Sequence, residues 1–169
     1  MPYSFDVLTE STASVEQVHS AFGEADYWMA RLAAFDAGTT LASLIVDADD
    51  SVTVTTTQDL RHDRLPGLIA KFYPGDLKIL RKETWSPLGD RRVHGHISIA
   101  VRGAPASGLG KALLAPAGSG SSLKFTATVE FKLPLVGGKI ETYIGGQLAE
   151  QIPAIQRFTT TWITEHDCD

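Results

Sequence analysis

The sequence has few of the features that mark secreted, membrane-spanning or nucleic-acid-binding proteins. It contains a single cysteine, Cys168, so it can form neither an internal disulfide nor a cysteine-based zinc site. No segment approaches the roughly 18 apolar residues of a membrane span, and residues 1–6 lack the basic and apolar regions of a signal peptide. The net charge of -5 offers no basic surface for nucleic acid. These absences predict a cytoplasmic protein without nucleic-acid partners or stable membrane insertion.

Motifs for catalysis and cofactor binding are also missing. The chain has no Gly-x-Ser-x-Gly nucleophile elbow, no glycine loop for phosphates and no His-Glu-x-x-His pair for zinc. His94 and His96 share one strand face, a spacing that suits a metal. However, Val93 and Ile97 mark the opposite face as buried, and no third ligand is evident in the sequence. We therefore expect solvent-facing histidines, no metal site and no cofactor.

The composition favours one folded domain. With 169 residues, 43% of them hydrophobic, the chain can bury a substantial core in a single domain over residues 1–169. No internal repeat or linker-like stretch divides it. The composition does not specify an oligomeric state.

The last third of the chain carries the clearest pattern. Residues 123–133 alternate between apolar and polar side chains, as in a strand with one buried and one solvated face. After Pro134 and Gly137-Gly138, apolar residues recur at helical spacing from Ile140 to Trp162. A helix of this length needs a large apolar partner, and an antiparallel sheet curved around it would supply one. Because such a pair commonly leaves a cavity, ligand binding is the leading hypothesis.

Three residues within this helix weaken it. By helix-propensity scales, Gly145 and Gly146 cost roughly 1 kcal/mol each relative to Ala, and Pro153 roughly 3 kcal/mol. They predict a helix that accepts a bend, which would open room between helix and sheet. Close packing against two short helices explains the glycines equally well.

The earlier part of the chain predicts a strand, two short helices and five further strands. A capping box at Ser14 and Gln17 begins the first helix, which Gly23 ends. Asp26 is the expected cap of the second helix. The aspartates of the turn at 47–51 suggest calcium, but the twelve-residue loop pattern is absent, which favours a solvated turn. The expected strands are 3–9, 41–46, 52–60, 77–85, 93–101, 109–115 and 123–133, with a short helix at 65–72 and a turn at 86–90.

This order of elements resembles the START-related (SRPBCC) superfamily. The resemblance is carried by the helix start at 14–18 (Ser-Val-Glu-Gln-Val) and by 134–141 (Pro-Leu-Val-Gly-Gly-Lys-Ile-Glu). It implies an α+β helix-grip fold, with a curved antiparallel sheet of about seven strands around one long C-terminal helix and two short helices after the first strand. More narrowly, the chain is similar to an uncharacterised actinobacterial family, of which 64–67 (Arg-Leu-Pro-Gly) is also a feature.

The resemblance also bears on function. The helix-grip fold is shared with birch-pollen allergens and polyketide cyclases, and it implies a hydrophobic tunnel for lipids, sterols or polyketides. Members range from carriers to enzymes, so the fold alone does not decide the reaction.

The strand at 77–85 places two charges on its apolar face. Alternation puts Arg81 and Glu83 on the same side as Leu77, Ile79 and Trp85. A buried charge costs several kcal/mol unless it is paired, so these two need each other, another polar group or a ligand head group. One interpretation is a polar anchor in an apolar cavity, with the arginine binding a carboxylate or ketone oxygen. The other is a rim pair at a sheet edge, or a bulge that reverses the register.

Further polar residues are candidates for the cavity wall. Thr56 and Gln58 continue the face of the strand at 52–60, although a nearby backbone carbonyl would explain them as well. Tyr143, Gln147 and Gln151 lie beside the apolar row of the last helix, either facing the cavity or forming a polar flank. The predicted ligand-binding residues are Thr56, Gln58, Ile79, Arg81, Glu83, Trp85, Ile97, Phe125, Val129, Tyr143, Gln147 and Leu148.

Three functions follow from these observations. The first is binding or transport of a hydrophobic small molecule between sheet and C-terminal helix. The second is a cyclase or dehydratase that uses the same cavity, with Arg81, Glu83 or Tyr143 in acid-base roles. The third is a ligand-free interaction or stress-related module. The proline- and glycine-bracketed helix at 65–72 is a hypothetical movable cover over the cavity mouth.

Overall fold

The computed structural model describes residues 2–61, 63, 67–71, 75–133 and 137–166, and it shows one antiparallel sheet packed against a long helix. In chain order the elements are β1 (Tyr3–Ser11), α1 (Val15–Phe22), α2 (Ala25–Phe35), β2 (Thr39–Val46), β3 (Val52–Leu60), α3 (Gly67–Ala70), β4 (Leu77–Leu88), β5 (Arg92–Arg102), β6 (Ala106–Ala117), β7 (Gly120–Phe131) and α4 (Gly137–His166).

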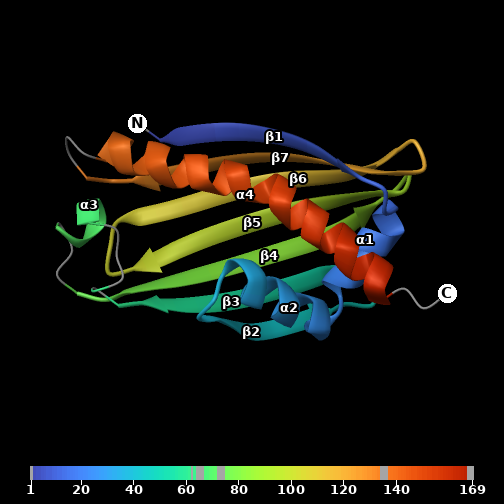
Figure 1. The fold of residues 1–169 in the computed structure, drawn as a ribbon, viewed down its shortest axis with the longest axis horizontal. Helices are drawn as coiled ribbons and strands as arrows, with labels where there is room; N and C mark the ends of the chain where they lie inside the picture. The colour runs from blue at the N-terminus through green and yellow to red at the C-terminus, as the bar shows by residue number, and fades with distance from the viewer. Residues whose placement is uncertain (1, 62, 64–66, 72–74, 134–136, 167–169) are drawn as a thin grey trace.

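The strands lie in the order β1-β7-β6-β5-β4-β3-β2. From β2 to β7, each strand therefore pairs with the next strand along the chain. The exception is β1, which forms the edge opposite β2 and pairs with β7. Figure 1 shows α4 running across one face of the curved sheet, from beside β1 to α1, while α2 lies over the same face near β2 and β3. This arrangement confirms the predicted helix-grip fold.

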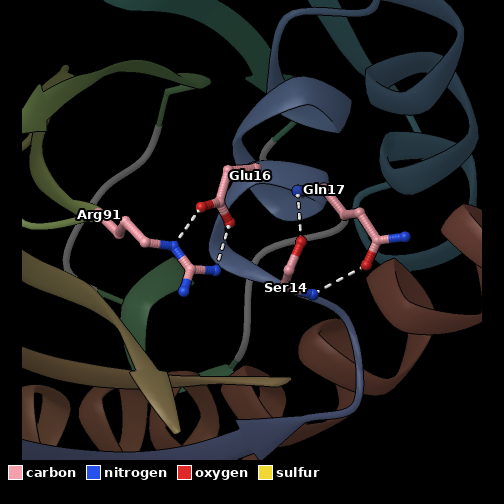
Figure 2. Close-up of polar contacts among 4 residues, drawn as sticks. All are labelled: Ser14, Glu16, Gln17 and Arg91. Carbon is pink, nitrogen blue, oxygen red and sulfur yellow. Dashed lines mark hydrogen bonds and ion pairs between the residues drawn. The ribbon is translucent and has the colours of Figure 1, made fainter. Parts of the chain in front are cut away.

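The start of α1 is built as the sequence predicts. The Ser14 hydroxyl accepts a hydrogen bond from the Gln17 N–H at 3.1 Å, and the Gln17 side-chain oxygen accepts one from the Ser14 N–H at 2.8 Å (Figure 2). Both bonds satisfy backbone donors that have no partner inside the helix. The helix ends at Gly23, as expected. The second short helix is present as predicted, but Asp26 is not its cap, because the N-cap is Glu24 and Asp26 lies in the first helical turn.

Several strands extend beyond their predicted bounds. Strand β4 continues to Leu88, so the turn predicted at 86–90 begins only at Gly89. Pro87 is tolerated because β3 begins at Val52, opposite Trp85, and Pro87 therefore lies beyond the end of that neighbour. Strand β6 spans Ala106–Ala117 instead of 109–115, and β7 spans Gly120–Phe131 instead of 123–133.

The 65–72 helix is described only in part. Residues Gly67–Ala70 form α3, while 65, 66 and 72 lie outside the described residues. The hypothesis of a movable cover therefore stays a prediction. Although α4 is 30 residues long, no helix in the described part of the chain combines the length and apolar character that crossing a membrane requires.

Two groups of buried side chains hold α4 against the sheet. The larger contains Phe22, Tyr27, Trp28, Trp85 and Trp162, near the C-terminal half of α4. Each such aromatic side chain removes some 150–250 Å² from water, so this cluster dominates the packing energy. The smaller group, Leu77, Phe131 and Ile140, lies near the start of α4.

Gly145 brings α4 close to the first strand. A side chain at this position would overlap the ring of Tyr3 in β1, whereas nothing lies within 4 Å of a Cβ at Gly146. Gly145 thus serves close packing, but against β1 and not against the short helices. It does not open space between helix and sheet.

Candidate functional site

Two adjoining cavities lie between the sheet and α4. The larger has a volume of about 230 Å³ and is lined by α2, by strands β2 to β7 and by the first half of α4. The smaller, of about 80 Å³, lies between β1, β4 to β7, α1, α2 and the middle of α4. Both are lined mainly by apolar side chains. The residues that line both cavities, here called the junction, are Arg31, Arg81, Glu83, Ile99, Gly108, Val129 and Leu148.

Ten of the twelve predicted ligand-binding residues line these cavities. Thr56, Gln58 and Ile79 line the larger one. Trp85, Ile97 and Phe125 line the smaller one. The remaining four are the junction residues Arg81, Glu83, Val129 and Leu148.

Tyr143 and Gln147 lie elsewhere. Tyr143 is 51% exposed, and its hydroxyl accepts a hydrogen bond from the exposed Gln147 amide at 3.0 Å. They form a polar flank on the solvent side of α4, so the interpretation that they face the cavity is wrong. The helix instead buries its other flank, where Glu141 and Gly145 contact the sheet side. Gln151, one turn further along, does line the smaller cavity.

The two charged residues of β4 form an ion pair on the inner face of the sheet. Arg81 Nε lies 2.9 Å from Glu83 Oε2, and the side chains are 26% and 2% exposed. The second carboxylate oxygen of Glu83 accepts a hydrogen bond from Trp85 Nε1 at 3.1 Å. The register places Arg81 between Thr56 of β3 and Ile99 of β5, so the pair lies in the middle of the sheet. This position rules out a rim pair at the sheet edge.

Arg31 of α2 is a third charged residue at the junction and is not among the predicted ligand-binding residues. It is 6% exposed, its Nη1 donates to the Tyr27 hydroxyl at 3.3 Å, and its guanidinium lies 4.5 Å from the centre of the Trp28 ring. The Tyr27 hydroxyl in turn contacts Thr159 of α4 at 2.5 Å. The sequence does contain an indication of this position. Arg31 follows Tyr27 by four residues and Trp28 by three, so helical spacing places it on the same face as these two aromatic side chains.

Two further buried polar residues were also missed. Glu141 lines the larger cavity, and its Oε2 accepts a hydrogen bond from the Phe131 N–H at 2.7 Å. Gln156 lines the smaller cavity and is 3% exposed. Glu141 Oε1 and Gln156 Nε2 are buried, and neither has a hydrogen-bond partner in the described structure. Both residues therefore add polar character to walls that are otherwise apolar.

The histidines of β5 lie on the strand face opposite Val93 and Ile97, which are buried. His96 is exposed and His94 is partly buried. Among the residues that the structure describes, no three His, Cys, Asp or Glu side chains come close enough to hold a metal ion.

The family comparison matches nearly the whole chain. A family model described as "Protein of unknown function (DUF2505)" matches residues 6–163. The chain belongs to this family. Its relatives include the uncharacterised proteins Rv0481c of Mycobacterium tuberculosis and Mb0491c of Mycobacterium bovis. Each is 40% identical over 173 residues, covering 98% of this chain and 99% of the relative. These actinobacterial relatives agree with the resemblance drawn from the sequence.

Solved structures support the fold of this DUF2505 protein. TTHA0849 from Thermus thermophilus superposes with a TM-score of 0.55 at 11% identity, covering 98% of each chain. Ara h 8.0201 superposes with a TM-score of 0.52 at 12% identity, and the match covers 98% of this chain and 100% of that chain. A third structure is a norcoclaurine synthase point mutant from Thalictrum flavum in complex with a transition-state analogue. It superposes with a TM-score of 0.50 at 17% identity, and the match covers 99% of this chain and 97% of that chain. At these identities the likeness shows the fold alone.

Proposed function

We propose that this DUF2505 protein binds a hydrophobic small molecule in the cavities between the sheet and α4. The observation that carries the proposal is a mainly apolar cavity of about 230 Å³ with charged side chains where it adjoins the smaller cavity. Packed protein interiors leave few voids larger than a water molecule, so a cavity of this size is not a by-product of ordinary packing. The volume lies just below the roughly 300–1,000 Å³ of pockets for drug-sized ligands, which favours a small or slender ligand.

The fold supports this proposal. The norcoclaurine synthase of similar fold was solved in complex with a transition-state analogue, so this architecture is compatible with a bound small molecule. In the present chain the strand register directs apolar side chains such as Ile79, Val129 and Phe125 toward the space under α4.

The contacts of the charged residues favour binding over the proposed acid-base chemistry. Tyr143 lies on the solvent side of α4, outside both cavities. One carboxylate oxygen of Glu83 accepts a hydrogen bond from Trp85, and the other lies 2.9 Å from Arg81 Nε in an ion pair. These contacts hold Glu83 in the cavity wall as the partner of Arg81, which favours a binding role over an acid-base role.

A neutral fluorescent probe tests the proposal. N-phenyl-1-naphthylamine should bind with increased fluorescence, and native mass spectrometry of protein purified from its own host should show a bound small molecule. Ile79→Trp, which fills the larger cavity, should reduce probe binding by about tenfold or more, equivalent to about 1.4 kcal/mol. The matched control is Ile45→Trp, because Ile45 is 53% exposed on β2 and lines neither cavity.

Folding of both variants is checked by circular dichroism and thermal unfolding. If Ile79→Trp unfolds, Leu148→Trp is the second cavity-filling variant, since Leu148 lines both cavities. Failure of the wild-type protein to bind the probe, together with no copurifying molecule, would contradict the proposal.

A further inference from the structure

Two arginines reach the junction from opposite sides. Arg31 comes from α2 and Arg81 from β4, and both line the two cavities. Among the described residues that line both cavities, the only other ionisable side chain is Glu83. The junction therefore holds two positive charges and one negative charge.

Among the residues that the structure describes, few hydrogen-bond donors of the two guanidinium groups have a protein acceptor. Each arginine carries five N–H donors and no acceptor. Within the described part of the chain, Arg31 donates to the Tyr27 hydroxyl, and Arg81 contacts Glu83 through Nε. The terminal nitrogens of Arg81 have no protein partner there, and its side chain is still 26% exposed. These nitrogens are free to bind an acceptor at the junction.

Among the described residues, the other acidic side chains that line the larger cavity form no ion pair with either arginine. Asp36 caps the C-terminal end of α2, and its charge acts on Arg31 only from beyond ion-pair distance. Glu141 lies on the far side of the larger cavity, bonded to Phe131 of β7, which is three strands from β4. Neighbouring strands are roughly 4.8 Å apart, so about 14 Å separates the β4 and β7 backbones.

Arg31 remains charged in this setting. Burial lowers the pKa of its guanidinium, but the charges of Tyr27 and Glu83, the hydrogen bond to Tyr27 and the more distant charge of Asp36 together raise the pKa above its ordinary value. The residues that line both cavities still carry one more positive than negative charge, so the junction is suited to a single additional negative charge.

We propose that the natural ligand is a singly charged carboxylic acid with an apolar chain, whose carboxylate binds between Arg31 and Arg81. Guanidinium groups bind carboxylates through paired, charge-assisted hydrogen bonds, which fixes the position of the head group. The apolar chain then extends from the junction into the larger cavity. This assignment rests on the proposed function, because it names the class of ligand for the same cavity.

Three ten-carbon probes with different head groups test the assignment on the wild-type protein. Decanoate, 1-decanol and decylamine are each competed against N-phenyl-1-naphthylamine at pH 7.5. Decanoate should bind at least about tenfold more tightly than decanol, and decylamine should bind most weakly. Equal affinities for decanoate and decanol, or tighter binding of decylamine, would overturn the carboxylate assignment while leaving cavity binding intact. If neither the fluorescent probe nor any of the three binds, the proposed function fails as well.

Variants of the junction separate recognition from structure. Arg81→Leu should weaken decanoate binding by about tenfold and leave decanol binding unchanged or tighter, whereas a purely structural role would weaken both. Glu83→Gln removes the competing carboxylate and should tighten decanoate binding. The matched control is Arg102→Leu, because Arg102 is exposed at the end of β5 and lines neither cavity. An unchanged preference for decanoate in a folded Arg81→Leu variant would overturn the proposal.

Discussion

The indole ring of Trp85 in β4 lies directly over Gly95 in β5. A Cβ at Gly95 would come within 2.5 Å of the ring, and the two residues are opposite each other in the β4–β5 register. In this position the ring packs against Phe22 of α1, with 4.8 Å between ring centroids, and its N–H donates to Glu83. Gly95 therefore allows the contact that orients Trp85 toward the ion pair.

Replacing Gly95 by alanine should disturb this packing. Because the added methyl group overlaps the ring, Gly95→Ala should lower the free energy of unfolding by about 1–3 kcal/mol, as overpacked sites do. Urea unfolding measures the change. The control is Gly89→Ala, since nothing lies within 4 Å of a Cβ at Gly89, and its effect should stay within about 0.5 kcal/mol. Equal stability of the two variants would contradict the packing described here.

The Arg81–Glu83 pair should respond asymmetrically to mutation. Glu83→Leu leaves Arg81 and Arg31 without a counter-charge at the junction. It should lower the free energy of unfolding by about 3–5 kcal/mol. Arg81→Leu should cost clearly less, because Glu83 keeps its bond to Trp85 and stays near Arg31. Chemical denaturation compares the two, with exposed Glu10→Leu as a control that should change little. If both variants lost the same free energy of unfolding, Arg31 would not act as a second positive partner of Glu83.

Glu16 and Arg91 should give a measurable pH response. Arg91 Nε and Nη2 lie 2.6 and 3.2 Å from the two carboxylate oxygens of Glu16 (Figure 2). The hydrogen bond from Arg91 is the main cause that lowers the pKa of Glu16 from 4.5 to about 2. Because the folded pKa is lowered, the stabilisation is present above about pH 4.5 and is lost as the pH falls toward 2.

The carboxyl titration of Glu16 followed by NMR tests this relationship. In Arg91→Gln the pKa of Glu16 should rise toward its ordinary value. Arg92→Gln is the neighbouring control, because Arg92 contacts Asp90 and not Glu16. If the pKa of Glu16 were the same in wild type and Arg91→Gln, the ion pair would not exist in solution.

Gly145 and Gly146 form a matched pair within one helix. Alanine at Gly146 should stabilise the protein by up to about 1 kcal/mol, because alanine is the better helix former and nothing lies near its Cβ. Alanine at Gly145 gains the same propensity but would overlap the Tyr3 ring, so it should destabilise the protein. Thermal unfolding of both variants gives the comparison. A stabilising Gly145→Ala would show that β1 and α4 are not in close contact.

The strand pattern predicted more of the cavity than the helix pattern did. Alternation along β4 fixes side-chain direction with a period of two, so Arg81 and Glu83 could be placed on the inner face from the sequence. On α4 the polar residues Glu141 and Tyr143 border the apolar row on opposite flanks. Helical spacing does not say which flank turns toward the sheet, and Gly145 against Tyr3 decides it in favour of Glu141. Arg31 was missed because its role depends on how α2 lies over the sheet, a tertiary arrangement.

The pairing of β1 with β7 has a consequence for synthesis of the chain. Tyr3 pairs with Val129 and Ser11 with Ser121, so the first strand made must wait for the last. At about 5–20 residues per second, the ribosome needs on the order of ten seconds to add the intervening residues. Until then β2 to β6 can pair one after another, while β1 has neither its strand partner β7 nor the helix that packs on Tyr3. Closure of the cavity is therefore a late, long-range event in folding, and its rate should be slow for a chain of this size.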